Sequence, residues 1–471
     1  MSGDLLCEAG AQSASTFNTA GSTDFELLQR DPAHKGALNR LGNMLFAAGK
    51  IIEAQRVLSL AVEHHPDDPM SRVNLANVLI KNGQLEKARE HLQYALGIDP
   101  EFRPVHAGLS FVLRDLGEHE EAALHRRKAF QGRCVVPVPY LGTAPPITVL
   151  ELISTHGGNV RTRLFLSDRV FRRYLVAAEF YDSTTVLPPH QLIVNAIGDA
   201  DLAGAALNGA AALVARASVP VINPPAAVLA TGRCAIAARL AAIPGAVTAK
   251  TANVSRKFLT GDNAEAALLN LGFCFPLLVR TPGFHGGENF VRVEEQRALA
   301  TAVAELPRAQ RAGAELPGDE LTVIEYLDAR AVDGKTRKYR VMMIDGALYP
   351  LHAAISHRWK IHYYSAEMTE SEENRAEDAA FLADMESVLG PKAINALKEI
   401  QRTLGLDYAG IDFSLNAQGE VLVFEANATM AFFAPDPDPR WDYRRPAVEN
   451  ICRAIRRMLL ERALKEPILA A

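Results

Sequence analysis

The stretch GIDFSLNAQGEVLVFEAN, residues 410–427, predicts a β-hairpin that organises the second half of the chain. Apolar and polar side chains alternate along its first strand, which is typical of a half-buried strand. The Gln418–Gly419 pair supplies turn chemistry. In the second strand, the same alternation predicts that Leu422 and Phe424 lie on the apolar face.

The opposite face of this hairpin carries Asp412, Glu425 and Asn427. A turn at the Gln–Gly pair sets Asp412 directly across from Glu425, with Asn427 one pleat further along. The hairpin has no basic residue between them, and like charges this close are unfavourable without a cation. Hard oxygen ligands that leave positions open suit Mg²⁺ carrying nucleotide phosphates. The alternative is a solvated polar face on an amphipathic hairpin.

Composition bounds the class of protein. The chain has 471 residues, 48% of them hydrophobic and 22% charged, which predicts a globular protein of two to four domains. The formal net charge of -5 argues against nucleic acid as a partner. The five cysteines are scattered without zinc spacing, and neither a signal peptide nor a long apolar run is visible. We therefore expect a cytoplasmic protein that binds no membrane.

The N-terminal region contains a repeat. Its period of 34 residues is marked by Pro32, Pro66 and Pro100, and again by Gly49, Gly83 and Gly117. This pattern resembles the tetratricopeptide repeat, a helix–turn–helix unit, with three units from about residue 35 to 131 and a half unit before them. Such arrays bind a protein or peptide, or form a homodimer. The alternative is a rigid spacer.

From Ile147 onward the pattern alternates strands and helices. Strands are expected at ITVLELIS, QLIVNAIG and VPVIN, and helices at Asp168–Glu179 and in the Ala-rich stretch of residues 200–217. This order predicts a small parallel sheet. Loops at the carboxyl ends of parallel strands often hold ligand, so Thr155–Asn159 and Asn195–Asp199 are candidate ligand loops.

Three further segments carry parts that a nucleotide site needs. Residues 276–293 predict a strand ending at Arg280, a glycine-rich loop, and a second strand; glycine lets backbone N–H groups approach phosphate. TVIEYLD, residues 322–328, predicts a strand with an edge for adenine and a carboxylate for ribose. A hairpin about Asp345–Gly346 then leads to the cation-rich stretch SHRWKIHYYS. A plain flexible hairpin is the alternative for the glycine-rich loop.

The order of these parts resembles the ATP-grasp superfamily of carboxylate–amine ligases, which includes glutathione synthetase, over roughly residues 147 to 440. The resemblance implies a multidomain fold, with an all-α tetratricopeptide repeat solenoid followed by an α/β pre-ATP-grasp domain and an α+β ATP-grasp domain. The expected boundaries are a flexible tail at 1–22, repeats at 23–134, a proline-rich linker at 135–146, the pre-ATP-grasp domain at 147–222 and the ATP-grasp domain at 223–471.

The resemblance also implies roles for individual residues. The implied magnesium ligands are Asp412, Glu425 and Asn427. The residues implied in ATP binding are Arg233, Arg280, Gly286, Gly287, Glu325, Tyr326, Leu327 and Asp328. The residues implied to face the phosphoryl group or the acidic substrate are Arg340, His357, Arg358 and Lys360. The chain departs from the family at Arg233 and Arg280, where lysines are usual, and arginine is larger and forked.

The activity that the resemblance implies uses ATP and Mg²⁺. A small-molecule or peptide carboxylate would form an acyl phosphate, and an amine substrate would displace the phosphate to give an amide. The repeats would dock a peptide or protein that supplies one substrate, or a partner. Two alternatives remain open at this stage: a kinase on the same scaffold, and a non-catalytic repeat scaffold.

Overall fold

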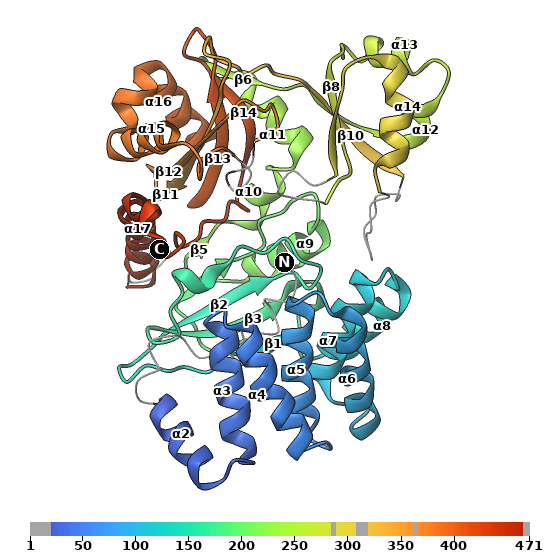
Figure 1. Cartoon of the computed structure of the whole chain (residues 1–471), viewed down its shortest axis with the longest axis vertical. Helices are drawn as coiled ribbons and strands as arrows, with labels where there is room; N and C mark the ends of the chain where they lie inside the picture. Colours follow the sequence, from blue (N-terminus) through green and yellow to red (C-terminus); the bar gives the residue numbers. More distant parts are fainter. Residues whose placement is uncertain (1–19, 284–288, 308–318, 362, 364–365, 465–471) are drawn as a thin grey trace. The chain divides into compact units, whose positions relative to one another are not determined.

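The computed structural model describes residues 20–283, 289–307, 319–361, 363 and 366–464. Two compact units divide the chain. Unit 1 comprises the described residues up to Gly157 together with Leu166–Gln191, and unit 2 comprises Gly158–Phe165 and the described residues from Leu192 onward. A region of helical repeats is thus followed by mixed α/β sheets, with labels as in Figure 1. The domain boundaries expected from the sequence stay predictions.

Helix pairs build the repeat region of unit 1. The described helices are α2 (Ala20–Arg30), α3 (Lys35–Ala47), α4 (Ile51–His64), α5 (Pro69–Lys81), α6 (Leu85–Ile98), α7 (Arg103–Asp115) and α8 (His119–Phe130). Gly49, Gly83 and Gly117 have φ of 77°, 72° and 84°, a left-handed conformation that ends the first helix of each pair at little cost. The three predicted turns are therefore confirmed.

The period of 34 residues is also visible in side-chain contacts. Arg72 Nε donates to the carbonyl of Pro66 at 2.7 Å, and one repeat later His106 Nε2 lies 2.9 Å from the carbonyl of Pro100. The other ring nitrogen of His106 lies 2.8 Å from His125 Nδ1. Equivalent positions thus tie the first helix of a pair to the preceding turn in both repeats.

The first helices of the second and third pairs are buried on every face. Residues Ser71–Leu79 of α5 and Val105–Leu113 of α7 are all buried. In α3, by contrast, only one stripe of residues is buried. A helix buried all round has no face left for a partner. Among these first helices, only α3 retains a substantial exposed surface.

The remainder of unit 1 contains strands. β2 (Ile147–Ile153) pairs in parallel with β3 (Phe171–Ala177), and β1 (Val135–Pro137) pairs antiparallel with β3. The proline-rich segment expected as a linker therefore begins with an edge strand. The helix expected over Asp168–Glu179 is wrong: the segment forms β3 and a short 3₁₀ turn, η3 (Ala178–Phe180).

The physical reason for this error is a buried ion pair. Arg173, which lies within the segment expected to be helical, donates to Glu151 of β2 at 2.9 Å, and both side chains are almost fully buried. Phe171 and Arg173 point inward while Arg172 is exposed, which is the period of a strand. The strand period is hard to recognise in the sequence because Arg173, a charged residue, occupies a buried position.

Polar contacts join the repeats to the loops that follow β2 and β3. Arg126 Nη1 of α8 lies 2.6 Å from His156 Nε2, and His156 Nδ1 lies 3.1 Å from Glu179 Oε1. Glu179 also accepts from Ser154 Oγ and from the N–H of Thr155. The loop predicted at Thr155–Asn159 to hold ligand thus begins with residues that link elements within unit 1.

Unit 2 begins with a short α/β segment. β4 (Leu192–Asn195) pairs in parallel with β5 (Val221–Ile222), and α9 (Gly204–Val214) connects them, as the Ala-rich pattern predicts. α10 (Pro225–Leu229) and α11 (Arg233–Leu240) follow, and η2 (Thr162–Leu164) also belongs to this unit.

A four-stranded antiparallel sheet follows in unit 2, in the order β7-β10-β8-β9. Its strands are β7 (Thr251–Ser255), β8 (Leu277–Arg280), β9 (Phe290–Val293) and β10 (Glu320–Glu325). The helices α12 (Arg256–Thr260), α13 (Ala264–Asn270) and α14 (Gln296–Glu305) share an apolar core with this sheet. Figure 1 draws all three helices beside β8 and β10.

A five-stranded sheet of order β12-β11-β13-β14-β6 completes unit 2. Its strands are β6 (Ala246–Thr248), β11 (Thr336–Ile344), β12 (Ala347–Ser356), β13 (Tyr408–Leu415) and β14 (Val421–Asn427). The elements packed around it are α15 (Glu372–Ala383), α16 (Met385–Leu404), η5 (Pro439–Arg444) and α17 (Arg445–Leu464). No helix within the described ranges is long and apolar enough to span a bilayer.

A buried carboxyl holds α15 and η5 against β12. Asp378 Oδ1 accepts from the N–H of Ala353 at 2.7 Å, and its Oδ2 accepts from the hydroxyl of Tyr443 at 2.7 Å. Burial raises the pKa of Asp378 from 3.8 to about 6, although these hydrogen bonds and Arg444 oppose the shift. The folded state therefore holds the Asp378 proton at a pH where the unfolded chain has lost it.

We predict that Asp378 makes unit 2 less stable as the pH rises from about 4 to 7. Between the two pKa values the folded state binds more protons than the unfolded state, so stability falls with rising pH by about 3 kcal/mol in total. Asp378→Asn removes this titration. Unfolding can be followed by the fluorescence of Trp359 and Trp441, both in unit 2.

The free energy of unfolding of Asp378→Asn should increase relative to that of the wild type as the pH rises through this window. Asp384→Asn is the control, because the pKa of Asp384 lies below 3.8 and its titration falls outside the window. A stability difference between wild type and Asp378→Asn that is constant from pH 4 to 7 would contradict the prediction.

Candidate functional site

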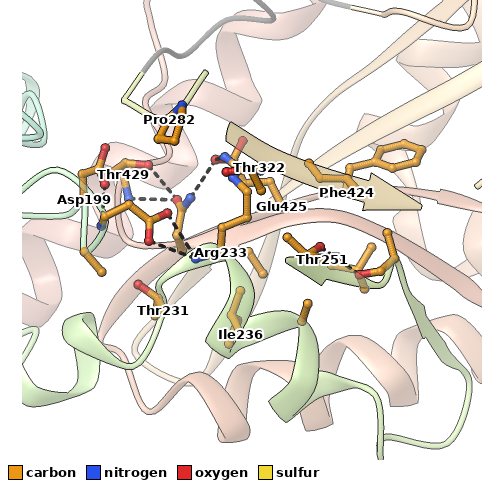
Figure 2. Close-up of a pocket in the computed structure, with 18 of the residues that line it drawn as sticks. Asp199, Thr231, Arg233, Ile236, Thr251, Pro282, Thr322, Phe424, Glu425 and Thr429 are labelled. Atoms are coloured by element: carbon orange, nitrogen blue, oxygen red, sulfur yellow. Dashed lines mark hydrogen bonds and ion pairs between the residues drawn. The ribbon is translucent and has the colours of Figure 1, made fainter. Parts of the chain in front are cut away.

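A pocket within unit 2 lies between its two larger sheets. Its lining comes from the loop after β4, from α11, from β7, β8 and β10 of the four-stranded sheet, and from β14 of the five-stranded sheet. Charged residues in the lining are Asp199, Asp201, Arg233, Arg280 and Glu425. Figure 2 shows Arg233 and Glu425 facing each other, with Thr429 and Asp199 nearby.

The central hairpin has the predicted pairing. β13 pairs antiparallel with β14, Asp412 lies opposite Glu425, and Gly410 lies opposite Asn427. A hydrogen bond from the N–H of Gly419 to the carbonyl of Asn416 closes the turn. The predicted register at Asp412 and Glu425 is therefore confirmed.

One detail of the hairpin was predicted wrongly. A β-bulge follows Asp412, so that Phe413 pairs with Val423 and Phe424 has no residue opposite it. The Phe424 side chain is 36% exposed and points away from Arg233 and Glu425 (Figure 2), whereas Val423 is buried. A bulge shifts the alternation by one residue, which sequence alternation alone does not reveal.

Asp412 is buried and paired with two cations from β11. Arg340 donates to both of its oxygens at 2.5 and 2.7 Å, and Lys338 Nζ donates at 2.9 Å. Burial alone would raise the pKa of Asp412, but the two cations hold it well below its ordinary value. The carboxylates thus have cations of their own, contrary to the isolated pair expected from the hairpin sequence.

Glu425 is paired with a cation from a different element. Arg233, the first residue of α11, donates through Nη2 to Glu425 Oε1 at 2.9 Å, and Asn427 Nδ2 donates to the same oxygen at 3.0 Å. Asn427 Oδ1 in turn accepts from the N–H and hydroxyl of Thr429. The predicted metal ligands therefore lie close together, each already hydrogen-bonded to the protein.

Arg280 supplies a second arginine to the pocket. It ends β8 as predicted, and its side chain is largely buried. Burial lowers the pKa of Arg280 to about 10, with repulsion from Arg233 acting in the same direction. The two arginines therefore lie close to each other in the lining, together with the carboxylates of Asp199, Asp201 and Glu425. Gly286 and Gly287, predicted to cover the phosphates, lie outside the described residues.

The residues predicted to bind adenine and ribose are the last residue of β10 and the three that follow it, and none of them is among the pocket lining. Glu325 exchanges two hydrogen bonds with the backbone of Lys250, one from its own N–H and one to its carboxylate. The guanidinium carbon of Arg292 lies 4.0 Å from the centre of the Tyr326 ring. Leu327 is half-buried, and Asp328 forms an ion pair with Arg330. The lining contribution of β10 is Thr322 and Ile324. The nucleotide roles of residues 325–328 stay predictions.

The expected cluster of substrate-binding cations is divided in the structure. Arg340 is shielded from solvent and paired with Asp412. His357 is exposed, and its Nδ1 lies 2.8 Å from Glu367 Oε2. Arg358 is exposed, and Lys360 Nζ donates to the carbonyl of Phe290 on β9. None of these four predicted residues belongs to the described lining of the pocket.

The sequence reasoning missed three members of the site. Lys338 has a signal in the sequence, since it lies two residues before Arg340 and so shares its face of the strand. Asp201 follows the predicted ligand loop that ends at Asp199, and its carboxylate accepts from the N–H of Arg233 at 3.2 Å. Thr429, which holds Asn427, has no comparable signal because it depends on the turn that follows β14.

The donor chemistry fits magnesium only in combination with a further ligand. In the described part of the chain, no group of three or more His, Cys, Asp and Glu side chains is arranged to hold a metal ion. Glu425 and Asn427 offer oxygen atoms in the pocket, and Mg²⁺ typically uses one or two carboxylates plus phosphate oxygens and water. The site thus fits an ion that arrives with a polyphosphate.

Comparisons with known proteins agree on the repeats. The tetratricopeptide repeat family matches residues 58–90. The TPR repeat-containing thioredoxin TTL4 of Arabidopsis thaliana is 28% identical over 123 residues, which is 26% of this chain and 17% of that protein. The chain therefore spans less than a fifth of the length of this relative. The N-terminal region is a tetratricopeptide repeat region.

Solved structures resemble the chain more distantly. The D-alanine–D-alanine ligase from Coxiella burnetii has 14% sequence identity and a TM-score of 0.35, over 59% of this chain and 70% of that chain. The D-alanine–D-alanine ligase from Bacillus anthracis, complexed with ATP, has 12% identity and a TM-score of 0.38, over 68% of this chain and 97% of that chain. At these TM-scores the likeness assigns neither a fold nor an activity.

We predict that Arg340→Met destabilises unit 2 by about 3 kcal/mol, because it leaves the buried Asp412 carboxylate with Lys338 as its remaining charged partner. Asp412→Asn in the same background should restore much of this loss, since the uncompensated charge is removed. Urea unfolding followed by tryptophan fluorescence measures both.

Arg402→Met is the matched control, because Arg402 forms an exposed ion pair with Glu399 within one helix. A loss of less than about 0.5 kcal/mol is expected there. Equal losses in Arg340→Met and Arg402→Met would show that the Asp412 pair does not stabilise the fold.

Proposed function

We propose that this protein is an ATP-dependent carboxylate–amine ligase of the ATP-grasp type that uses Mg²⁺. The observation that carries the proposal is the pairing of Arg233 with Glu425, next to Arg280, in a pocket lined by the four-stranded and the five-stranded sheet. A nucleotide triphosphate requires cations for its oxygens and oxygen ligands for its metal ion. This pocket combines both within a single cavity.

The pocket also has an apolar part that suits a nucleobase. Ile236 and Leu240 of α11 line it together with Ile324 of β10. Ligand sites of this kind are mostly apolar, with a few charged groups that fix orientation. In the proposed arrangement the base contacts these side chains, and the backbone of residues 325–328, at the end of β10, offers the edge for adenine.

Within this proposal, Arg233 and Arg280 bind the phosphates. Glu425 and Asn427 would hold a magnesium ion, which would neutralise charge on the phosphate oxygens. Asp412, opposite Glu425 on the hairpin, is the third proposed ligand, and in the structure its carboxylate accepts hydrogen bonds from Arg340 and Lys338.

The proposed reaction has two steps. A carboxylate oxygen of the first substrate attacks the γ-phosphorus of ATP, and the bond to ADP breaks. The nitrogen of the amine substrate then attacks the acyl carbon, phosphate leaves with the bonding electrons, and the amine proton passes to solvent. The contribution of the protein is positioning and charge neutralisation. The repeats dock the peptide or protein that supplies a substrate, or a partner.

We predict that Arg280→Ala weakens ATP binding by about 1.5–3 kcal/mol, the usual effect of losing a hydrogen bond to a charged group. Isothermal titration calorimetry with ATP and Mg²⁺ measures the affinity. Arg297→Ala is the control, because Arg297 is exposed and pairs with Glu295 outside the pocket. Unchanged affinity in Arg280→Ala would mean that the phosphates bind elsewhere.

A second prediction separates a ligase from a kinase on the same scaffold. With a carboxylate substrate, ATP and hydroxylamine in place of the amine, a ligase should produce a hydroxamate, because hydroxylamine attacks an acyl phosphate. A phosphate ester from a kinase does not react in this way. The product is detected by its coloured ferric complex, with a reaction lacking ATP as the control. A phosphorylated product that survives hydroxylamine would refute the ligase.

A further inference from the structure

Arg233 occupies the position at Glu425 that a metal ion would need. Its Nη2 lies 2.9 Å from Glu425 Oε1, the same oxygen that accepts from Asn427 Nδ2. Both side chains are largely shielded, with 21% of Arg233 and 26% of Glu425 exposed. A divalent ion bound at Glu425 would therefore lie beside a guanidinium in a partly dry site, where like charges repel strongly.

The backbone of Arg233 is fixed while its side chain has other anions within reach. Asp201 accepts from the Arg233 N–H at the start of α11. The guanidinium is attracted to Glu425 first, and then to Asp201 and Asp199. A polyphosphate in the pocket would add several negative charges beside Arg233 and Arg280. The side chain can then leave Glu425 without a movement of the helix.

We propose that Arg233 blocks metal binding at Glu425 until a polyphosphate engages the arginine. This inference rests on the proposed function and deepens it, since it assigns an order of binding to the same site. Metal and nucleotide are then positively coupled, and by linkage each raises the affinity of the other by the same factor. Arg233 acts as a positioning residue for the metal ligand.

The small set of protein ligands around Glu425 supports this order. The described residues offer no dedicated cage of three or more charged or imidazole ligands, so phosphate oxygens must complete the coordination. Asn427 Oδ1 is also engaged, by the N–H and the hydroxyl of Thr429. The two proposed ligands, Glu425 and Asn427, are therefore already hydrogen-bonded to described residues of the protein.

The test is direct binding of Mn²⁺, a paramagnetic substitute for Mg²⁺, to the full chain. Electron paramagnetic resonance reports the free Mn²⁺ concentration without any turnover. Without nucleotide, the wild type should bind Mn²⁺ weakly, and Arg233→Gln should bind it at least about tenfold more tightly because the competing cation is gone. Adding a non-hydrolysable ATP analogue should tighten Mn²⁺ binding to the wild type by at least about tenfold, after correction for the Mn²⁺ that the analogue binds in a protein-free sample.

Two controls locate the effect. Arg239→Gln changes an arginine on the same helix whose partners are the carbonyls of Ala230 and Thr403, and it should behave as the wild type. The double variant Arg233→Gln with Glu425→Gln should lose the gained binding, because the metal ligand itself is neutralised. Arg233→Met, with melting temperatures for all variants, guards against an effect of misfolding.

The outcomes are separable. Tight Mn²⁺ binding by the wild type without nucleotide, or no gain in either Arg233 variant, would overturn the inference. If the analogue fails to bind while Arg233→Gln still gains Mn²⁺ affinity, the proposal that the pocket binds ATP is refuted. The proposal that Arg233 blocks metal binding at Glu425 is then still supported.

Discussion

The balance of charge across β11, β13, β14 and α11 is the constraint on which the site depends. Burying the Asp412 carboxylate is tolerable only because Arg340 and Lys338 reach both of its oxygens. Glu425 is matched in the same way by Arg233 from a separate element. These pairs fix the side chains of the hairpin, and with them the shape of the pocket wall.

The sequence predicted the local parts of this fold well, because local signals have local causes. The 34-residue period fixes the helix pairs, since each glycine turn is needed at its own position. Alternation and a Gln–Gly turn fix the hairpin register at Asp412 and Glu425. The failure at β3 has the opposite origin: Arg173 is buried because Glu151 of a neighbouring strand neutralises it. A charge partner that is distant in the sequence cannot be recognised from a short segment of neighbouring residues.

The same distinction holds for the site. The proximity of Asp412, Glu425 and Asn427 could be predicted because their spacing lies within one hairpin. The arginine on Glu425 comes from a residue 192 positions earlier in the chain, and pairing at that range is set by tertiary packing. The bulge that turns Phe424 outward is likewise a property of the pair of strands and not of either strand. The sequence of the hairpin alone therefore does not predict its charge partners or its bulge.

The burial of α5 and α7 changes what the repeats can contribute. A repeat array that served only as a tethered receptor would keep the first helix of each pair open toward its ligand. Here two of the three are buried along most of their length, and α8 is joined through Arg126 to the loops after β2 and β3. The repeats are therefore an integral part of unit 1, and the exposed surface of the described helix pairs lies mainly on α3 and on the second helices α4, α6 and α8.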